Sequence, residues 1–281
     1  MSDIFESYEK KRPFLVCVDS DGCAMDTMDI KHFRCFGPEM IREWDLEEFA
    51  EPVQENWNHV NLYSMTRGVN RFKGLLAALE NADGKYGHID GLAELEEWVE
   101  SSPELSNRAI EAQLQKQDSA ILSKALEWSK AVNESISRLP HEENKPFNGV
   151  GDALACAHQF ADVAIVSSAN REAVVEEWTR FGLIESTDIL CTQEAGTKAA
   201  CIAELLKKGY EPNRVLMVGD APGDLDAAQT NGVLFYPILV RNEDKSWKDF
   251  TDTVLQEFIH GEYAGKNETE QIEAFRENLT S

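Results

Sequence analysis

The sequence is poor in basic residues and has no long apolar run. Its 281 residues include 27 Lys and Arg against 51 Asp and Glu, which gives a formal net charge of -24. Such a charge repels nucleic acid and anionic membrane surfaces, so we expect neither as a partner. No apolar run approaches the length that spans a bilayer, and residues 1–13 hold no apolar signal region. We therefore expect a cytoplasmic protein.

Paired cysteine motifs are also absent. The six cysteines form no C-x-x-C motif, and four of them lie within apolar patterns: Cys17, Cys156, Cys191 and Cys201. We expect small, reduced core residues and no zinc site. Hydrophobic residues make up 42% of the chain, which is typical of a globular protein rather than a disordered one.

Short apolar runs mark the predicted strands, which lie at 14–18, 163–166, 188–191, 215–218 and 233–239. Helical patterns accompany the later strands, at 150–160, 171–181, 197–208 and 225–230. Strands that alternate with helices indicate a parallel sheet with right-handed crossovers. We therefore predict an α/β fold.

An all-helical insertion separates the first strand from the others, with helical patterns at 38–46, 48–63, 68–81, 92–100 and 120–139. Residues 23–36 predict a loop or hairpin, and 140–146 predict the returning linker. The acidic stretch 246–279 is also predicted to be helical. The predicted domains are 1–26 and 146–281 for the sheet, and 27–145 for the insertion. Because the insertion follows the end of the first strand, we expect it to act as a lid.

Two carboxylates, Asp19 and Asp21, follow the first predicted strand. Ligands of open parallel sheets bind at this edge, and buried charges need a partner or a metal. A cation held by both residues is one interpretation. The other is an Asx-rich turn in which Gly22 has a positive φ, and the short D-x-D-G motif alone does not decide between them.

Polar residues also lie at the ends of the other strands. Ser167 follows the second strand, Lys198 opens the helix after the third, and Asp220 and Asp224 follow the fourth. All carboxyl ends of a parallel sheet lie on one side, so these side chains can converge. Carboxylates, a hydroxyl and an ammonium together suit phosphoryl transfer.

Each residue type has a role in such a reaction. Mg²⁺ prefers hard oxygen ligands, which Asp19, Asp220 and Asp224 supply. Without a cation, a carboxylate and a phosphate 4 Å apart repel by roughly 4 kcal/mol at an effective dielectric of about 20. A carboxylate is a competent nucleophile toward phosphorus, and Asp21 can protonate the leaving oxygen and then activate water. Ser167 and Lys198 can bind phosphate oxygens.

This set of motifs resembles the haloacid dehalogenase-like (HAD) superfamily, over residues 13–26 and about 147–240. The resemblance implies a Rossmann-like parallel-sheet core with an inserted all-helical cap. The placement of the insertion is similar to the cap of the β-phosphoglucomutase-like branch, although it is longer. One departure is Ala199 after Lys198, where capped relatives often have proline.

The resemblance also implies a role for each motif residue. Asp19 is the expected nucleophile and a Mg²⁺ ligand, and Asp21 is the expected general acid/base, with its backbone carbonyl on the metal. The remaining expected contacts are Ser167 and Lys198 to the phosphoryl group, Asp220 to Mg²⁺, and Asp224 to Mg²⁺ directly or through water.

Structural interpretations compete with these roles. Asp224 also fits a helix N-cap region, and Lys198 also fits a solvated helix position. Ser167 also fits a cap of the next helix, with Ser168 competing for either the cap or the phosphate.

The insertion carries weaker signals. Arg67 and Arg71 are spaced to share a helix face and could bind an anionic part of a substrate, but ordinary pairing with acidic neighbours is the slightly favoured interpretation. Residues just beyond the first motif are further candidates for substrate contact: Lys31, His32 and Arg34. The tryptophans are expected in the core of the insertion: Trp44, Trp57, Trp98 and Trp128.

The motifs predict a Mg²⁺-dependent phosphatase that acts on a small phosphorylated metabolite through an aspartyl-phosphate. A phosphomutase uses the same motifs. A phosphonate hydrolase would need a cap lysine, for which Lys31 and Lys73 are candidates. A ligand-binding protein without turnover is the alternative outside enzymes. A Rossmann dinucleotide loop is not supported, because Gly149-Val150-Gly151 lacks the third glycine and precedes its strand.

Overall fold

The computed structural model describes residues 4–140 and 143–280. The chain forms two compact units: one runs from Asp29 to His141, and the other joins Met1–Met28 to Glu142–Ser281. We call them the cap unit and the sheet unit. The predicted division lay at 26/27 and 145/146. Part of the predicted linker, residues 141 and 142, lies outside the described residues, as do residues 1–3 of the predicted first segment.

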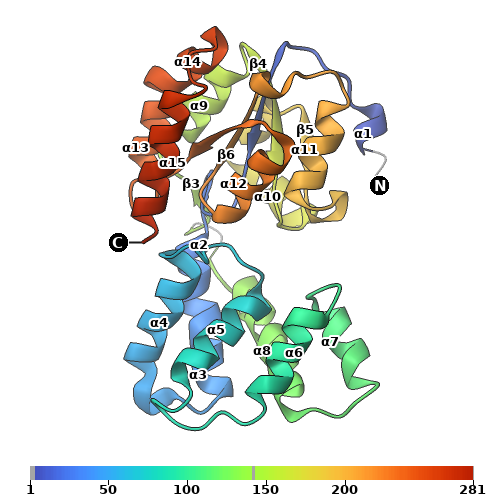
Figure 1. The fold of residues 1–281 in the computed structure, drawn as a ribbon, viewed down its shortest axis with the longest axis vertical. Coiled ribbons are helices and arrows are strands. Elements are labelled where there is room, and N and C mark those ends of the chain that lie inside the picture. Colours follow the sequence, from blue (N-terminus) through green and yellow to red (C-terminus); the bar gives the residue numbers. More distant parts are fainter. Residues whose placement is uncertain (1–3, 141–142, 281) are drawn as a thin grey trace. The chain divides into compact units, whose positions relative to one another are not determined.

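A five-stranded parallel sheet forms the centre of the sheet unit (Figure 1), with the order β5-β4-β1-β6-β7. Its strands are β1 (Phe14–Val18), β4 (Ala161–Val166), β5 (Ile189–Cys191), β6 (Val215–Gly219) and β7 (Leu234–Pro237). The strands β4 and β6 are buried throughout their length, and β1 in all but its first residue, as expected for apolar runs covered on both faces. The parallel α/β fold with an all-helical insertion is therefore confirmed.

The strand order decides which loops meet. β1 lies between β4 and β6, and Val18 pairs with Ile165 on one side and with Val218 on the other. The residues that follow these three strands consequently lie next to one another at the carboxyl edge of the sheet. This edge carries Asp19 and Asp21 after β1, Ser167 after β4, and Asp220 after β6.

Helices cover both faces of the sheet. In Figure 1, α9 and α13 lie on one side of it and α11 and α12 on the other. On the first side, Val16 and Val18 of β1 share a buried core with Trp178 and Trp247. The helices of this unit are α1 (Ile4–Ser7), α9 (Val150–Ala157), α10 (Arg171–Arg180), α11 (Lys198–Leu206), α12 (Pro222–Asn231), α13 (Glu243–Asp249), the π-helix η7 (Phe250–Val254), α14 (Leu255–His260) and α15 (Lys266–Asn278).

The segment after the first motif differs from the prediction of a loop or hairpin. Only β2 (Met25–Asp26), which pairs with β3 (Lys145–Pro146), fits a hairpin-like pairing. The following residues are helical, in α2 (Met28–Lys31) and the π-helix η1 (His32–Phe36). The prediction of a loop or hairpin was wrong for 28–36. The helical pattern there is weak, and the segment is helical because its side chains pack on the cap core, as partly buried Phe36 does against Trp57.

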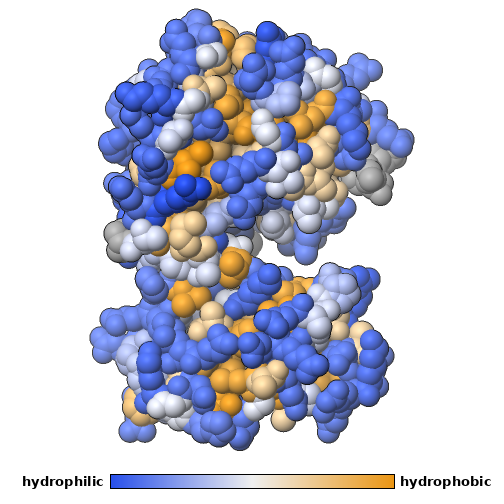
Figure 2. Space-filling view, in the orientation of Figure 1, coloured by the Kyte–Doolittle hydropathy of each residue, from blue (hydrophilic) through white to orange (hydrophobic). Residues whose placement is uncertain are grey.

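The cap unit is helical, with α3 (Gly37–Glu43), α4 (Ala50–Leu62), α5 (Arg71–Ala82), α6 (Leu92–Ser101), α7 (Asn107–Leu114) and α8 (Ala120–Ser137). The short helix α7 was not predicted. All four tryptophans of the unit are buried in its core, as expected. In the space-filling view of Figure 2, most of the visible surface of each unit is hydrophilic, in line with the acidic composition.

Two expectations from composition can be compared with the structure. All six cysteines are free thiols, and five of them are buried. Among the described residues, no helix is both long and apolar enough to cross a membrane.

Candidate active site

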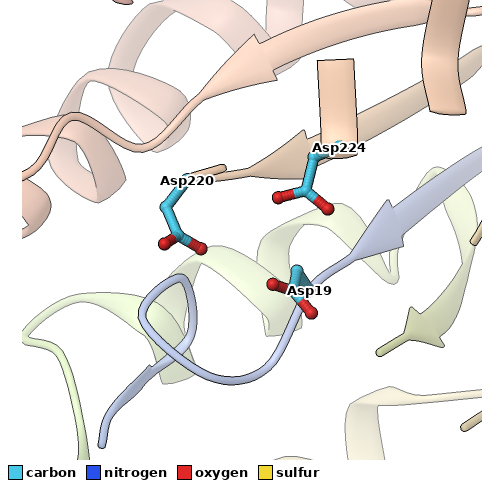
Figure 3. Close-up of side chains that lie close together, drawn as sticks. All are labelled: Asp19, Asp220 and Asp224. Atoms are coloured by element: carbon cyan, nitrogen blue, oxygen red, sulfur yellow. The ribbon is translucent and has the colours of Figure 1, made fainter. Parts of the chain in front are cut away.

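Three buried carboxylates converge at the carboxyl edge of the sheet (Figure 3). Asp19 follows β1, Asp220 follows β6, and Asp224 lies in the first turn of α12. One oxygen from each lies within 4.8 Å of the others. The three residues are 5%, 1% and 0% exposed, so none of the charges is solvated by bulk water. Among the described residues this is the one such cluster of potential metal ligands.

Local backbone structure brings these carboxylates together. The N–H of Asp19 donates to the carbonyl of Val218, which extends the β1–β6 pairing as far as the site. The Asp224 carboxylate accepts the N–H of Ala221 at 3.0 Å, which fixes the start of α12. A Cβ at Gly219 would lie 2.3 Å from Cγ of Asp224, so this close approach requires glycine. The glycine before Asp220 therefore makes room for the third carboxylate.

Lys198 lies between two of the carboxylates. Its Nζ is 2.9 Å from Oδ2 of Asp19 and 2.5 Å from Oδ1 of Asp224. The lysine is the first residue of α11, where the Thr197 side chain caps the helix by accepting the N–H of Ala200. Its side chain is 15% exposed, so the interpretation of Lys198 as a solvated helix residue is wrong.

Burial and pairing oppose each other at this cluster. The pKa of Asp19 is raised, because burial disfavours its charged form and the neighbouring charge of Lys198 offsets only part of that rise. The pKa of Asp224 is also raised by burial, with Lys198 opposing the shift and Asp220 adding to it. Burial alone would lower the pKa of Lys198, but its two carboxylate partners outweigh this and raise it. The lysine is therefore charged at neutral pH.

The donor set fits a hard divalent cation. Three carboxylates and one ammonium carry a formal charge of -3 + 1 = -2 when all are ionised. Buried charge of that size needs compensation, and an all-oxygen donor set suits Mg²⁺ rather than a thiolate-preferring metal. Asp19, Asp220 and Asp224 are the residues that would hold it. The carboxylate of Asp21 is outside this cluster.

Asp21 is held by a residue that the sequence analysis did not identify. The hydroxyl of Thr27 donates to Oδ1 of Asp21 at 2.6 Å, and Thr27 is fully buried while Asp21 is partly exposed. The backbone N–H of Thr27 donates to the carbonyl of Met25, which anchors the threonine at the end of β2. The orientation of the Asp21 carboxylate therefore depends on a side chain six residues away. No motif marks Thr27 in the sequence.

The two serines after β4 differ in exposure. Ser167 is buried, and its N–H donates to the carbonyl of Cys191 in the neighbouring strand. Its hydroxyl accepts the N–H of Ala169 at 3.1 Å, and Ser168 is exposed. Asn170, not either serine, caps the next helix by accepting the N–H of Ala173. Within residues 4–140 and 143–280 the Ser167 hydroxyl accepts this bond and donates none, so its proton can be donated to a ligand. Ser167 is therefore a better candidate than Ser168 for a phosphate contact.

The expected helix face of Arg67 and Arg71 does not form. The helix α5 begins only at Arg71, because Asn70 caps it and Gly68 before it has a φ of +72°. Arg67 is buried and donates to the carbonyl of Leu62. Arg67 therefore contributes to the fold of a turn, whatever else it contacts.

Arg71 has an unusual environment for a cation in an acidic chain. Its Nη1 donates to Oγ of Ser129 at 3.0 Å and to Oδ1 of Asn133 at 2.7 Å, and its guanidinium lies over the ring of Phe36. Burial lowers the pKa of Arg71. The competing interpretation, pairing with an acidic neighbour, is not supported for Arg71 within residues 4–140 and 143–280, where its contacts are neutral.

Comparisons with known proteins agree with the architecture. The model of the haloacid dehalogenase-like hydrolase family matches residues 69–238. No significant match was found among curated proteins. A solved structure of a "putative phosphoglycolate phosphatase" from Lactobacillus delbrueckii subsp. bulgaricus is similar, with 14% identity, a TM-score of 0.51, and coverage of 81% of this chain and 86% of that one. At that identity the similarity shows the fold alone.

A second solved structure is similar over more of the chain. It is a haloacid dehalogenase-like family hydrolase from Streptococcus pneumoniae, with 12% identity, a TM-score of 0.48, and coverage of 85% of this chain and 91% of that one.

Proposed function

The chain belongs to the haloacid dehalogenase-like hydrolases, and from that premise we propose that it is a Mg²⁺-dependent phosphatase of a small phosphorylated metabolite. Its reaction would proceed through a phosphoryl group carried on Asp19. The observation that carries the proposal is the buried group of Asp19, Asp220 and Asp224 with Lys198 between two of its members. Such a group would lower the stability of an ordinary hydrophobic core, because buried charges are costly unless they are compensated.

Two steps account for the hydrolysis. In the first, a carboxylate oxygen of Asp19 attacks phosphorus, the bond from phosphorus to the ester oxygen breaks, and Asp21 gives its proton to the departing alcohol. In the second, Asp21 takes a proton from water, whose oxygen attacks the phosphorus of the acyl phosphate. Phosphate leaves and the Asp19 carboxylate is restored. Thr27 holds Asp21 in position for both proton transfers.

The other residues bind charge rather than transfer protons. Lys198 lies beside the attacking carboxylate and supplies a positive charge to an equatorial phosphoryl oxygen. Ser167 is placed to donate its hydroxyl hydrogen to another. Mg²⁺, when bound by Asp19, Asp220, Asp224 and the backbone carbonyl of Asp21, supplies the charge that offsets repulsion between the nucleophile and the phosphate.

The substrate is proposed only as a class. The chain is strongly acidic, so a phosphate ester needs local cations, and Lys198 with the metal supplies them. Arg71 remains a proposed contact for an anionic part of the substrate, because its partly buried guanidinium has neutral partners. Arg67 is the weaker of the two candidates, since it binds a backbone carbonyl of its own turn.

Phosphate release from a panel of phosphorylated metabolites and p-nitrophenyl phosphate tests the proposal. The panel is run with Mg²⁺ and with EDTA, on the wild type and on Asp19→Asn, which keeps the shape of the side chain and removes its charge. Release that requires Mg²⁺ and is lost in Asp19→Asn supports the proposal. Equal release by wild type and variant, or no release by either, contradicts it, and sugar phosphates that isomerise without releasing phosphate would indicate a mutase instead.

A further inference from the structure

Two buried tryptophans bind the loop that carries the proposed catalytic aspartates. We define the β1 loop as Asp19–Ala24, which directly follows β1. The indole N–H of Trp178, on α10, donates to Oγ of Ser20 at 2.9 Å. The indole N–H of Trp247, on α13, donates to the backbone carbonyl of Cys23 at 2.9 Å. Both tryptophans are fully buried.

The two contacts hold the loop at opposite ends of a tight turn. The carbonyl of Ser20 accepts three N–H groups, from Cys23, Ala24 and Met25. Gly22 has a φ of +80°, which permits the reversal of the chain. Asp19 and Asp21 flank Ser20 at the start of this turn. Trp178 binds Ser20, and Trp247 binds Cys23. Both contacts therefore lie on the loop that carries the two carboxylates.

The bonds to the tryptophans are difficult to replace. Ser20 and Cys23 are fully buried, so water cannot take over the hydrogen bond of a lost indole. Both rings also belong to the core cluster that contains Val16 and Val18 of β1. Packing in this core restrains both rings, and their hydrogen bonds connect the core to the loop.

We propose that Trp178 and Trp247 are positioning residues that set the geometry of Asp19 and Asp21 through the β1 loop, which gives α13 of the acidic C-terminal region a part in the reaction. The expected effect of these tryptophans on turnover rests on the proposed function, whereas their expected effect on the order of the loop does not. Displacements of about 1 Å in a catalytic group can lower rates by about a hundredfold, so hydrogen bonds outside the reacting atoms can control kcat.

The test uses Trp178→Phe and Trp247→Phe, which keep an aromatic ring and remove the N–H. Tyr263→Phe is the matched control, because it also removes one buried hydrogen bond to a backbone carbonyl and keeps an aromatic ring. That carbonyl belongs to Phe235 in β7, which is in the same unit but outside the β1 loop. We expect kcat to fall by about tenfold or more in each tryptophan variant, with KM little changed, which corresponds to about 1.4 kcal/mol in the barrier. The control should lose a similar amount of thermal stability and keep its kcat.

Ser20→Ala provides a second route that removes the same bond and leaves the Trp178 ring in place, and it should lower kcat as Trp178→Phe does. The double variant Ser20→Ala/Trp178→Phe should be no slower than the slower single variant, because both remove the same bond. Additive losses, or tryptophan variants whose kcat falls no further than that of the control, would overturn the inference.

Hydrogen exchange of the amides of Gly22–Met25 separates this inference from the proposed function. Exchange should be faster in both tryptophan variants than in the wild type, and unchanged at these amides in Tyr263→Phe. If the wild type releases no phosphate from any substrate, the proposed function fails, and exchange still decides: faster exchange in the tryptophan variants supports the positioning role, and unchanged exchange rejects it.

Discussion

The Nζ atom of Lys198 lies 2.9 Å from Oδ2 of Asp19, with both side chains largely withdrawn from solvent. The pair joins the first residue of α11 to the residue after β1, two points 179 positions apart in the sequence. Removing one partner of a buried pair leaves an uncompensated charge, which costs about 3–5 kcal/mol. Lys198 therefore has two separable effects, one on stability and one on the reaction.

Lys198→Met should separate these effects. The substitution keeps an apolar stem and removes the ammonium, so the formal charge of the cluster changes from -2 to -3. We expect kcat to fall by about a hundredfold or more, as when one charged donor to a transition state is lost. We also expect Mg²⁺ to raise the melting temperature of the variant by more than that of the wild type. Thermal unfolding with Mg²⁺ and with EDTA measures this, and an equal rise in both proteins would contradict the account.

Thr27→Val should weaken the proposed general acid without removing it. Valine has nearly the shape of threonine but cannot donate to Asp21, and a hydrogen bond to a charged group contributes about 1.5–3 kcal/mol. We expect kcat to fall about tenfold or more, and Thr27→Ser, which keeps the hydroxyl, to recover most of it. Steady-state kinetics of the two variants make the comparison. Equal kcat values for Thr27→Val and Thr27→Ser would show that the Thr27 hydroxyl does not position Asp21.

Gly219→Ala should disrupt the carboxylate cluster. The added Cβ would lie 2.3 Å from Cγ of Asp224, so Asp224 or the backbone at 219 must shift and the geometry of the cluster changes. We expect lower stability and loss of most activity. Gly223→Ala, four residues on, is the control, because a Cβ there meets no atom within 4 Å and alanine favours a helix by about 1 kcal/mol. Comparable activity in the two variants would be inconsistent with the described packing.

The pH dependence of stability should show the role of Asp188, which accepts from Nζ of Lys11 at 2.8 Å and from the N–H of Val163 at 2.9 Å. Burial acts to raise the pKa of Asp188, but these bonds outweigh it and the pKa is lowered. A lowered folded-state pKa stabilises the protein above the unfolded value of about 3.9, and this stabilisation is lost as the pH falls through the folded value. We therefore expect wild type to exceed Asp188→Asn in unfolding free energy at pH 7, and the difference to shrink below about pH 4. Denaturant unfolding at both pH values checks this, and a difference independent of pH would refute it.

Much of the fold and of the acidic cluster could be predicted because both depend on local patterns. The apolar run before Asp19 ends where β1 ends, and a parallel sheet brings the ends of neighbouring strands together. The resemblance to the haloacid dehalogenase-like family, drawn from those motifs, is confirmed by the family match. Asp220 and Asp224 lie beside Asp19 for the same reason.

The parts that could not be predicted depend on contacts between distant residues or on weak local signals. Trp178 and Trp247 are 158 and 224 positions from the loop atoms they bind, and no pattern in the sequence connects them. The helices within 28–36 have four and five residues and α7 has eight, which is too short to give a clear helical periodicity. Arg67 was placed on a helix because its spacing to Arg71 fits one, but the capping side chain of Asn70 starts the helix later.

The most direct test of the central claim is to detect the phosphoryl group on Asp19. Asp21→Asn should slow the attack of water more than the first step when the leaving group is p-nitrophenolate, which departs without a proton. Mixing this variant with p-nitrophenyl phosphate and Mg²⁺, quenching with acid and analysing peptides by mass spectrometry should show one phosphoryl group on the peptide that contains Asp19. It should be absent when Asp19→Asn is added to the same variant. Release of p-nitrophenolate by Asp21→Asn with no phosphorylated peptide, or with the phosphoryl group on another residue, would contradict the account.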